Sequence, residues 1–182
     1  MTIHTDSADD LFDADSRNVT FDSVGLDDID RFAALMLHHL PAGIAVGLVG
    51  TLGAGKTRLV QGIAKAAQVG DVEVTSPTFT LLQTYPGQPT LHHLDAYRIE
   101  DEDEFLELGV DELFDDSQAW TLVEWADRVR AAMPVDTLWI RILIMGSADN
   151  RVIQVVSPND AIDAAVRRAR AIIETERGKG SE

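Results

Sequence analysis

The segment 50–57 reads GTLGAGKT and fits the pattern G-x-x-x-x-G-K-[ST]. Glycines at these spacings let the backbone wrap tightly and aim successive N–H groups at one anion. A helix beginning at Gly55 adds the positive end of its dipole and its unpaired N–H groups. Lys56 is placed to bridge the β- and γ-phosphates of a triphosphate, and the Thr57 hydroxyl is a hard ligand for Mg²⁺. The pattern predicts a phosphate-binding loop, the alternative being a glycine-rich turn that binds nothing.

Two carboxylates are candidates for the acidic side chain that such a loop requires at the end of a neighbouring buried strand. Glu124 ends the apolar run WTLVE, and Asp95 ends LHHLD, which alternates less cleanly. We predict that Glu124 holds Mg²⁺ directly or nearly so. Asp95 is predicted either to support the magnesium site without binding the ion or to position the attacking water. The alternative for either residue is a helix cap or a solvated strand end. Trp125, which directly follows Glu124, either covers the nucleotide or belongs to the core.

Other polar residues carry weaker signals. The segment 75–79, TSPTF, is a proline-stiffened loop with small hydroxyls, and it either senses the γ-phosphate or is an ordinary turn. Arg98 and Arg128 either neutralise charge in a transition state or form surface ion pairs. His92 and His93 are adjacent, so on a strand they would point to opposite faces. The sequence therefore does not predict that these two histidines bind one metal ion.

Composition limits the partners of the chain. Its 182 residues suit one globular domain with a real core, and the net charge of −16 repels a phosphate backbone. Direct binding of DNA or RNA is therefore not expected, and a role on RNA would need a basic partner. The absence of cysteine excludes disulfides, zinc thiolate sites and cysteine nucleophiles. Neither a membrane-spanning stretch nor a secretory signal is visible, so we expect a cytoplasmic protein that does not contact a membrane.

Apolar periodicity predicts the elements that position these residues. Short apolar runs bounded by turn residues predict buried strands, and apolar residues at helical spacing predict amphipathic helices. The predicted strands are Asn18–Val24, Ile44–Val49, Thr80–Tyr85, Thr90–Asp95, Trp120–Glu124, Asp136–Met145 and Val152–Val156. The predicted helices are Leu26–Leu40, one following the glycine-rich loop, one or two short ones within Ile99–Asp116, Ala126–Met133 and 159–177.

Four segments in this order resemble the TsaE family, also called YjeE. They are GTLGAGKT at 50–57, SPTF at 76–79, HLDAYR at 93–98 and EWADR at 124–128. TsaE proteins are small bacterial ATPases of the tRNA threonylcarbamoyladenosine pathway. The resemblance covers roughly residues 18–157. This chain differs from the family in the stretch 26–30, LDDID, where family members tend to carry a threonine close to the adenine.

The resemblance implies ATP and Mg²⁺ as cofactors. It supports Lys56, Asp95 and Glu124 as catalytic residues, and Thr57 and Glu124 as metal ligands. It also implies that 76–79 is a switch element. The nucleotide-binding residues predicted on this basis are Gly50, Gly53, Ala54, Gly55, Lys56, Thr57, Arg58 and Thr78.

The same resemblance implies partners and a kind of activity. TsaB and TsaD-like subunits would be the partners, ATP hydrolysis would reset their complex, and tRNA would be contacted only through them. We therefore expect an ATPase that is slow alone and stimulated by its partners.

Two other functions remain open on the sequence alone. A small-molecule kinase usually brings lid arginines over the phosphates, but there is no Arg or Lys between Arg98 and Arg128, and ten acids lie from Glu100 to Asp116. A nucleotide-sensing protein with little hydrolysis would carry the same loop. A GTPase is not favoured, because none of the three lysines lies in an [NT]-K-x-D setting.

The expected fold is a three-layer α/β domain like those of P-loop NTPases. Its sheet is predicted to be mixed, with a parallel centre around Ile44–Val49 and Trp120–Glu124 and antiparallel hairpins at the edges. Residues 1–17 hold five aspartates and one arginine and are predicted to be a disordered acidic tail. Residues 18–157 form the predicted ATPase domain, and 158–182 a C-terminal amphipathic helix with a frayed end. We expect this helix to pack on the domain rather than to cover a partner.

Overall fold

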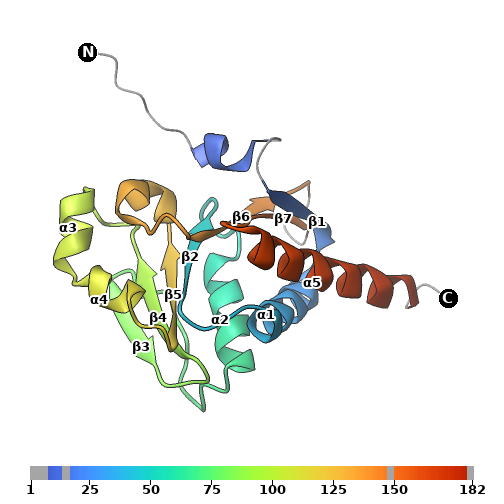
Figure 1. Cartoon of the computed structure of the whole chain (residues 1–182), viewed down its shortest axis with the longest axis horizontal. Helices are drawn as coiled ribbons and strands as arrows, with labels where there is room; N and C mark the ends of the chain where they lie inside the picture. The colour runs from blue at the N-terminus through green and yellow to red at the C-terminus, as the bar shows by residue number, and fades with distance from the viewer. Residues whose placement is uncertain (1–7, 14–16, 147–149, 180–182) are drawn as a thin grey trace.

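A mixed β-sheet forms the centre of the molecule in the computed structural model, which describes residues 8–13, 17–146 and 150–179 (Figure 1). Within the described chain the sheet is seven-stranded, in the order β1-β7-β6-β2-β5-β4-β3. The strands are β1 (Asn18–Val24), β2 (Ile44–Val49), β3 (Leu82–Tyr85), β4 (Thr90–Asp95), β5 (Ala119–Glu124), β6 (Leu138–Ile144) and β7 (Arg151–Val156).

The centre of the sheet is parallel, as predicted, and its edges are antiparallel. β2 runs parallel to both β5 and β6, and β5 runs parallel to β4. β3, β7 and β1 are antiparallel to their neighbours. Each predicted hairpin thus contributes one strand to the parallel centre and one to an antiparallel edge. Because parallel strands end at the same edge, β2, β4 and β5 deliver their last residues to one place.

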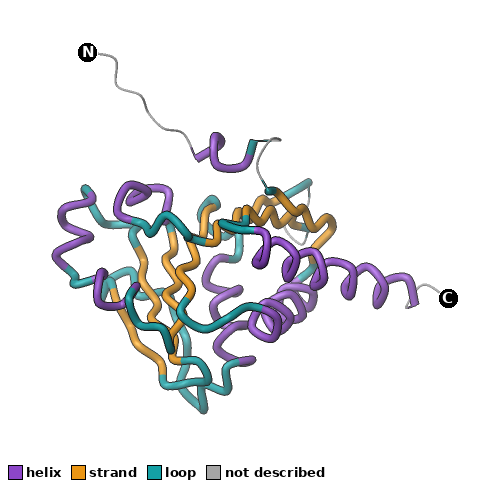
Figure 2. The backbone as a smooth tube through the Cα atoms, in the orientation of Figure 1, coloured by secondary structure: helices purple, strands orange, loops and turns teal. Residues whose placement is uncertain are grey.

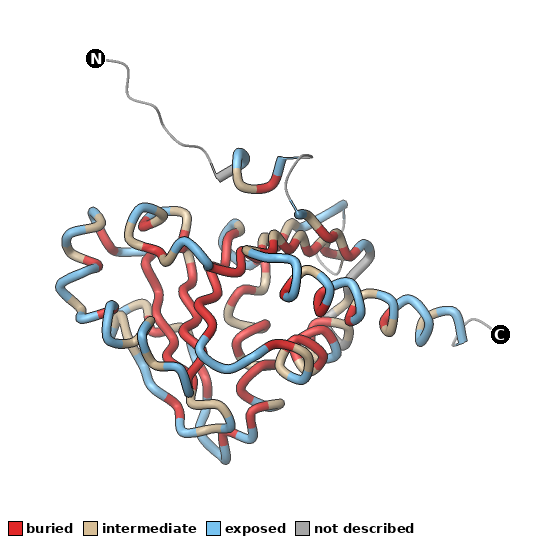
Figure 3. Tube along the Cα trace, in the orientation of Figure 1, coloured by how far each residue is buried: buried red, intermediate tan, exposed pale blue. Residues whose placement is uncertain are grey.

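Helices cover both faces of this sheet, which gives the predicted three layers (Figure 2). One face carries α1 (Leu26–His39), α2 (Lys56–Ala66) and α5 (Asp160–Lys179), and the other carries η1 (Ala8–Phe12), α3 (Glu102–Glu107), α4 (Val110–Phe114) and η2 (Ala126–Ala132). A separate hydrophobic cluster fills the space on each face. Burial is concentrated on the central strands and on the inner sides of the helices (Figure 3). No helix among the described residues is long and apolar enough to cross a bilayer.

α5 packs on the domain, as expected from its apolar stripe. Its inner face joins the core of α1 and α2 through Ile162, Val166 and Ile173, all of which are buried. Nearer the C-terminus of the helix, Glu176 accepts a hydrogen bond of 2.8 Å from Nε of Arg31 on α1. The helix is therefore part of the folded domain.

The structure differs from the sequence-based expectations at two places. Within the predicted disordered tail, η1 is a short 3₁₀ helix, because Phe12 is buried against β7 and against Arg141, whose guanidinium lies 4.3 Å from the Phe12 ring centroid. The predicted helix after β5 is the 3₁₀ segment η2, interrupted by non-helical backbone at Val129. The rest of the predicted tail, 1–7 and 14–16, lies outside the described residues, as do 147–149 of the predicted turn and 180–182 of the frayed end.

Candidate functional site

The glycine-rich loop connects the end of β2 to the start of α2. At Gly50 the backbone has φ 153°, and a Cβ atom there would lie 2.5 Å from the carbonyl oxygen of Ile142. Gly55 has φ 115° and is the N-cap of α2, a position where L side chains would be strained. Both glycines are therefore required by the backbone path. The path brings the N-terminus of an eleven-residue helix to the carboxyl edge of the sheet.

A buried arginine supports this loop from β7. Nε of Arg151 donates a hydrogen bond of 2.8 Å to the carbonyl of Ala54, and both residues are buried. Gly53, by contrast, follows the exposed Leu52 and has φ 76° with open space where a side chain would begin. Arg151 was not predicted from the sequence, because no motif connects a residue on β7 with a loop nearly a hundred positions earlier.

Lys56 is turned back onto its own loop. Its Nζ donates to the carbonyl oxygens of Gly50 at 2.7 Å and Thr51 at 3.1 Å, and it lies 3.7 Å from the ring centroid of Trp125. Burial lowers the pKa of Lys56 from its ordinary 10.5, an effect that the nearby carboxylates of Glu124 and Asp95 oppose. The ammonium is thus held by carbonyl dipoles and an aromatic face. An anion bound in the loop would give it a negatively charged partner.

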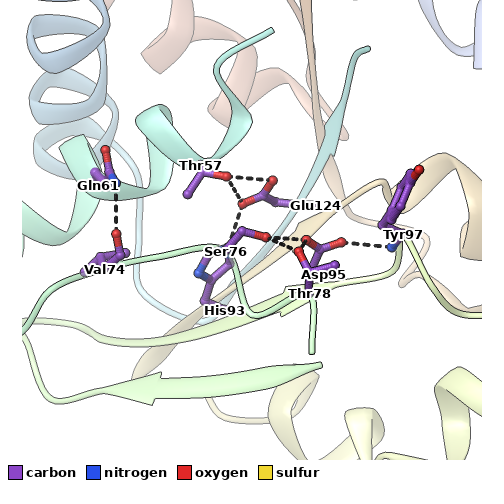
Figure 4. Close-up of polar contacts among 9 residues, drawn as sticks. All are labelled: Thr57, Gln61, Val74, Ser76, Thr78, His93, Asp95, Tyr97 and Glu124. Atoms are coloured by element: carbon purple, nitrogen blue, oxygen red, sulfur yellow. Dashed lines mark hydrogen bonds and ion pairs between the residues drawn. The ribbon is translucent and has the colours of Figure 1, made fainter. Parts of the chain in front are cut away.

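Thr57 and Glu124 meet across the boundary between α2 and β5. The Thr57 hydroxyl donates to Oε1 of Glu124 at 2.8 Å and also lies 3.1 Å from Oε2 (Figure 4). Nε2 of His93 lies 2.9 Å from Oε1 of the same carboxylate. Glu124 is 2% exposed, so these contacts replace the water that a carboxylate would otherwise bind.

Asp95 lies beside Glu124, since the two are paired in the register of β4 and β5. Its Oδ2 accepts hydrogen bonds from the hydroxyls of Ser76 and of Thr78, the latter at 2.8 Å. Its Oδ1 accepts one from the backbone N–H of Tyr97 at 2.9 Å (Figure 4). The hydroxyl-bearing loop is therefore fastened to the carboxylate that ends β4, a contact that the sequence did not predict.

These groups line one cleft of about 360 Å³. Lys56, Thr57, Thr78, Asp95, Glu124 and Trp125 all contribute to its wall. A larger groove of about 630 Å³ lies along α2 and the following loop, but it contains neither Asp95 nor Glu124. The smaller cleft is the candidate site, because among the described pockets only its lining combines the glycine-rich loop, Lys56 and the two carboxylates.

Three arginines considered from the sequence have other partners. Arg58 lines the cleft, but its guanidinium forms an ion pair of 2.7 Å with Asp30 on α1. Arg128 donates to the carbonyl of Ile99 at 3.1 Å, and Arg98 lies over the ring of Phe79 at 5.1 Å. Neither Arg98 nor Arg128 lines the cleft.

Trp125 lies at the cleft, where it contacts both Lys56 and Tyr97. Its ring centroid is 5.0 Å from that of Tyr97, and its backbone has φ 57°, which is unusual for a residue with a large side chain. The Trp125 side chain lines the cleft and also packs against the second hydrophobic cluster, so features of both alternatives drawn from the sequence are present.

The oxygen atoms at this site fit a magnesium ion that is shared with a phosphate. A hydroxyl and a carboxylate converge within hydrogen-bonding distance, and both are the hard ligands that Mg²⁺ prefers. Among the described residues no group of three or more acidic, histidine or cysteine side chains could hold a metal ion alone. Magnesium at this place would therefore need additional oxygen ligands from phosphate or water.

Comparison with known proteins decides the family. The family model described as "Threonylcarbamoyl adenosine biosynthesis protein TsaE" matches residues 25–153. The chain belongs to the TsaE family. It is 34% identical to the tRNA threonylcarbamoyladenosine biosynthesis protein TsaE of Treponema pallidum over 125 residues, covering 69% of this chain and 91% of the relative. The corresponding protein of Bacillus subtilis is 36% identical over 131 residues, covering 71% and 80%.

A crystal structure of a TsaE-like chain has the same architecture. YdiB from Bacillus subtilis superposes with a TM-score of 0.72 at 26% identity, covering 86% of this chain and 97% of the YdiB chain. The family match confirms the resemblance drawn from the four motifs, and the superposition confirms the α/β fold. This TsaE protein therefore belongs to a family of tRNA threonylcarbamoyladenosine biosynthesis.

Proposed function

We propose that this TsaE protein is a magnesium-dependent ATPase that acts with TsaB and TsaD-like partners in threonylcarbamoyladenosine modification of tRNA. The observation that carries the proposal is the convergence of Thr57 and Glu124, 2.8 Å apart, beside the ammonium of Lys56 and at the mouth of a glycine-rich loop. This arrangement places a helix N-terminus, a cation and two hard oxygen ligands around one cleft.

Each side chain has a role that follows from its chemistry. The loop amides and Lys56 bind the β- and γ-phosphate oxygens of ATP, while Arg58 and Thr78 line the same cleft. Thr57 and Glu124 hold Mg²⁺, which supplies positive charge to the phosphate oxygens. The oxygen of the attacking water bonds to the γ-phosphorus while the bond from that phosphorus to the β–γ bridging oxygen breaks. Asp95 accepts the proton that this water loses.

The hydrogen bonds that Asp95 accepts would make turnover slow in the isolated protein. Its Oδ2 accepts from Ser76 and Thr78, and its Oδ1 accepts from Tyr97. These hydrogen bonds occupy acceptor positions on both carboxylate oxygens and so compete with a water molecule for them. Release of the 76–79 loop would free Oδ2 for water, and a partner that moves this loop would stimulate hydrolysis.

Charge supports an indirect role on tRNA. With a net charge of −16 the chain repels a polyanion, so basic surfaces on the partner proteins would bind the tRNA. The proposed site of action is the cytoplasm, where these partners would meet tRNA.

The direct test is ATP hydrolysis measured for the protein alone and then with TsaB and TsaD-like proteins. We expect slow phosphate release alone and faster release in the mixture, with Glu124→Gln inactive in both. Phosphate transfer to a small-molecule acceptor would instead indicate a kinase. Tight nucleotide binding without stimulated hydrolysis would indicate a nucleotide sensor, and either result would overturn the ATPase proposal.

A further inference from the structure

His93 is buried within the sheet and contacts the carboxylate assigned to magnesium. It lies in the middle of β4, is 0% exposed, and points to the same face of the sheet as Asp95 two residues later. Its Nε2 lies 2.9 Å from Oε1 of Glu124 on the adjacent strand β5 (Figure 4). A polar ring in a fully buried position must satisfy its hydrogen bonds there, and this carboxylate is its partner.

The surroundings of the ring determine which nitrogen carries the proton. Nδ1 is buried and has no hydrogen-bond partner among the described residues. A proton on Nδ1 would leave a donor unpaired and would place the lone pair of Nε2 against the carboxylate of Glu124. The proton therefore lies on Nε2, and His93 donates to Oε1.

This hydrogen bond differs from the other contacts of Glu124. The Thr57 hydroxyl also donates to Glu124, but Thr57 is itself assigned to the metal, so it cannot support the carboxylate independently. Ligating groups are commonly oriented by a hydrogen bond from a residue that does not bind the ion. Among the described residues whose side chains hydrogen-bond to Glu124, His93 is the one outside the proposed ligand set.

We propose that His93 is a positioning residue that holds the Glu124 carboxylate in the orientation required to bind magnesium together with nucleotide. This inference rests on the proposed function, since it presupposes that Glu124 is a metal ligand. It assigns a role to a histidine that the sequence connected with neither metal nor catalysis. The neighbouring His92 faces the other way, where Nδ1 lies 3.0 Å from the Thr84 hydroxyl, and it supplies a matched comparison.

The test measures metal binding rather than turnover. Mn²⁺, which accepts the same oxygen ligands, is titrated by electron paramagnetic resonance into the full-length protein saturated with a non-hydrolysable ATP analogue. The variants are His93→Leu, His93→Gln and His93→Asn. Glutamine can place an amide N–H where Nε2 lies, whereas asparagine places it nearer to Nδ1. His92→Leu is the control for replacing a buried histidine on the same strand.

We expect His93→Leu and His93→Asn to weaken Mn²⁺ binding by roughly ten- to a hundredfold, the usual cost of losing such a supporting contact. His93→Gln should restore most of the affinity, and His92→Leu should leave it unchanged. Affinity for the analogue in EDTA should be similar in all variants, because the loop amides and Lys56 do not depend on this histidine. If His93→Leu does not fold, the comparison of Gln with Asn carries the test.

Equal Mn²⁺ affinity in wild type and His93→Asn would overturn the inference, as would equal losses for Gln and Asn. A parallel loss of analogue affinity in EDTA would show a general structural role and would overturn it too. Failure of the proposed function looks different. In that case the wild-type protein itself binds neither the analogue nor Mn²⁺.

Discussion

The Thr57 hydroxyl at the first turn of α2 donates a 2.8 Å hydrogen bond to Glu124 at the last residue of β5, across 67 positions of sequence. This contact joins the phosphate-binding loop to the sheet edge where the acidic residues end their strands. Glu124 is 2% exposed, so its charge depends on partners inside the protein or on a cation in the cleft. The proposed magnesium ion would be such a cation.

Replacing Glu124 by glutamine should therefore abolish turnover without unfolding the protein. The amide has the same shape and can keep a hydrogen bond to Thr57, but it lacks the charge that holds Mg²⁺. We expect the rate of ATP hydrolysis to fall by about a hundredfold or more, with nucleotide affinity in EDTA within about tenfold of wild type. Glu107→Gln, an exposed acid on α3, is the matched control. A fully active Glu124→Gln protein would show that the wrong acid was chosen.

Asp95→Asn should separate binding from chemistry. Loss of a general base costs typically about 10²–10⁴ in rate, whereas the phosphate contacts of the loop and Lys56 stay in place. Single-turnover hydrolysis and analogue binding are measured on the same samples, with the exposed Asp103→Asn on α3 as the control. Parallel losses of affinity and rate would argue that Asp95 shapes the cleft instead of acting on water.

Lys56→Met should stabilise the nucleotide-free protein while weakening its affinity for ATP. Burial lowers the pKa of Lys56 below 10.5, so keeping the folded state charged costs free energy. Removing the charge should raise the melting temperature of the nucleotide-free protein, measured by differential scanning calorimetry against wild type. Lys65→Met, an exposed lysine on the same helix, is the control and should have little effect.

The difference in stability between Lys56→Met and wild type should depend on pH in a defined direction. Below the lowered pKa, Lys56 is charged in both the folded and the unfolded wild-type chain. Only the folded chain has the free-energy cost of holding that charge in a buried position. As pH rises through the window below 10.5, the folded lysine loses its proton first, so stability of the wild type increases relative to Lys56→Met. The gap in melting temperature should narrow in that window. A gap that widens would contradict the assigned cause.

Ile173→Ala should destabilise the whole domain, because α5 belongs to its core. Ile173 is 5% exposed and contacts the cluster shared with α1. Truncating such a side chain costs roughly 2–5 kcal/mol in the free energy of unfolding, measured by urea denaturation. The exposed Arg168→Ala on the same helix should change it by no more than about 0.5 kcal/mol. Equal effects of the two substitutions would mean that α5 is not part of the cooperative unit.

The sequence predicted those parts of the fold that depend on local pattern. The apolar run Ile44–Val49 and the glycine-rich loop after it identified β2 and α2, because strand burial and helix capping leave a signal in neighbouring residues. The sequence predicted that β6 exists, as the first strand of the hairpin at 136–156. It did not predict that β6 pairs in parallel with β2, because strand pairing joins residues that are distant in the sequence. η1 was missed because its burial depends on Arg141 from β6.

The candidate site shows the same division. Lys56 and Thr57 follow from one motif, and the strand ends identified Glu124 and Asp95. The contacts that restrain these groups were not predicted. His93 reaches Glu124 across 31 positions through the register of β4 against β5. The hydroxyl of Thr78 reaches Asp95 across 17 positions through the path of the loop before β3, which no local pattern indicates.

Nucleotide binding at the glycine-rich loop is tested by isothermal titration calorimetry of a non-hydrolysable ATP analogue into the full-length protein, with and without Mg²⁺. We expect one-to-one binding that Mg²⁺ strengthens and that Lys56→Ala weakens roughly ten- to a hundredfold, the cost of losing a charge-assisted contact to phosphate. No heat of association for the wild-type protein, or an unchanged affinity for Lys56→Ala, would contradict it.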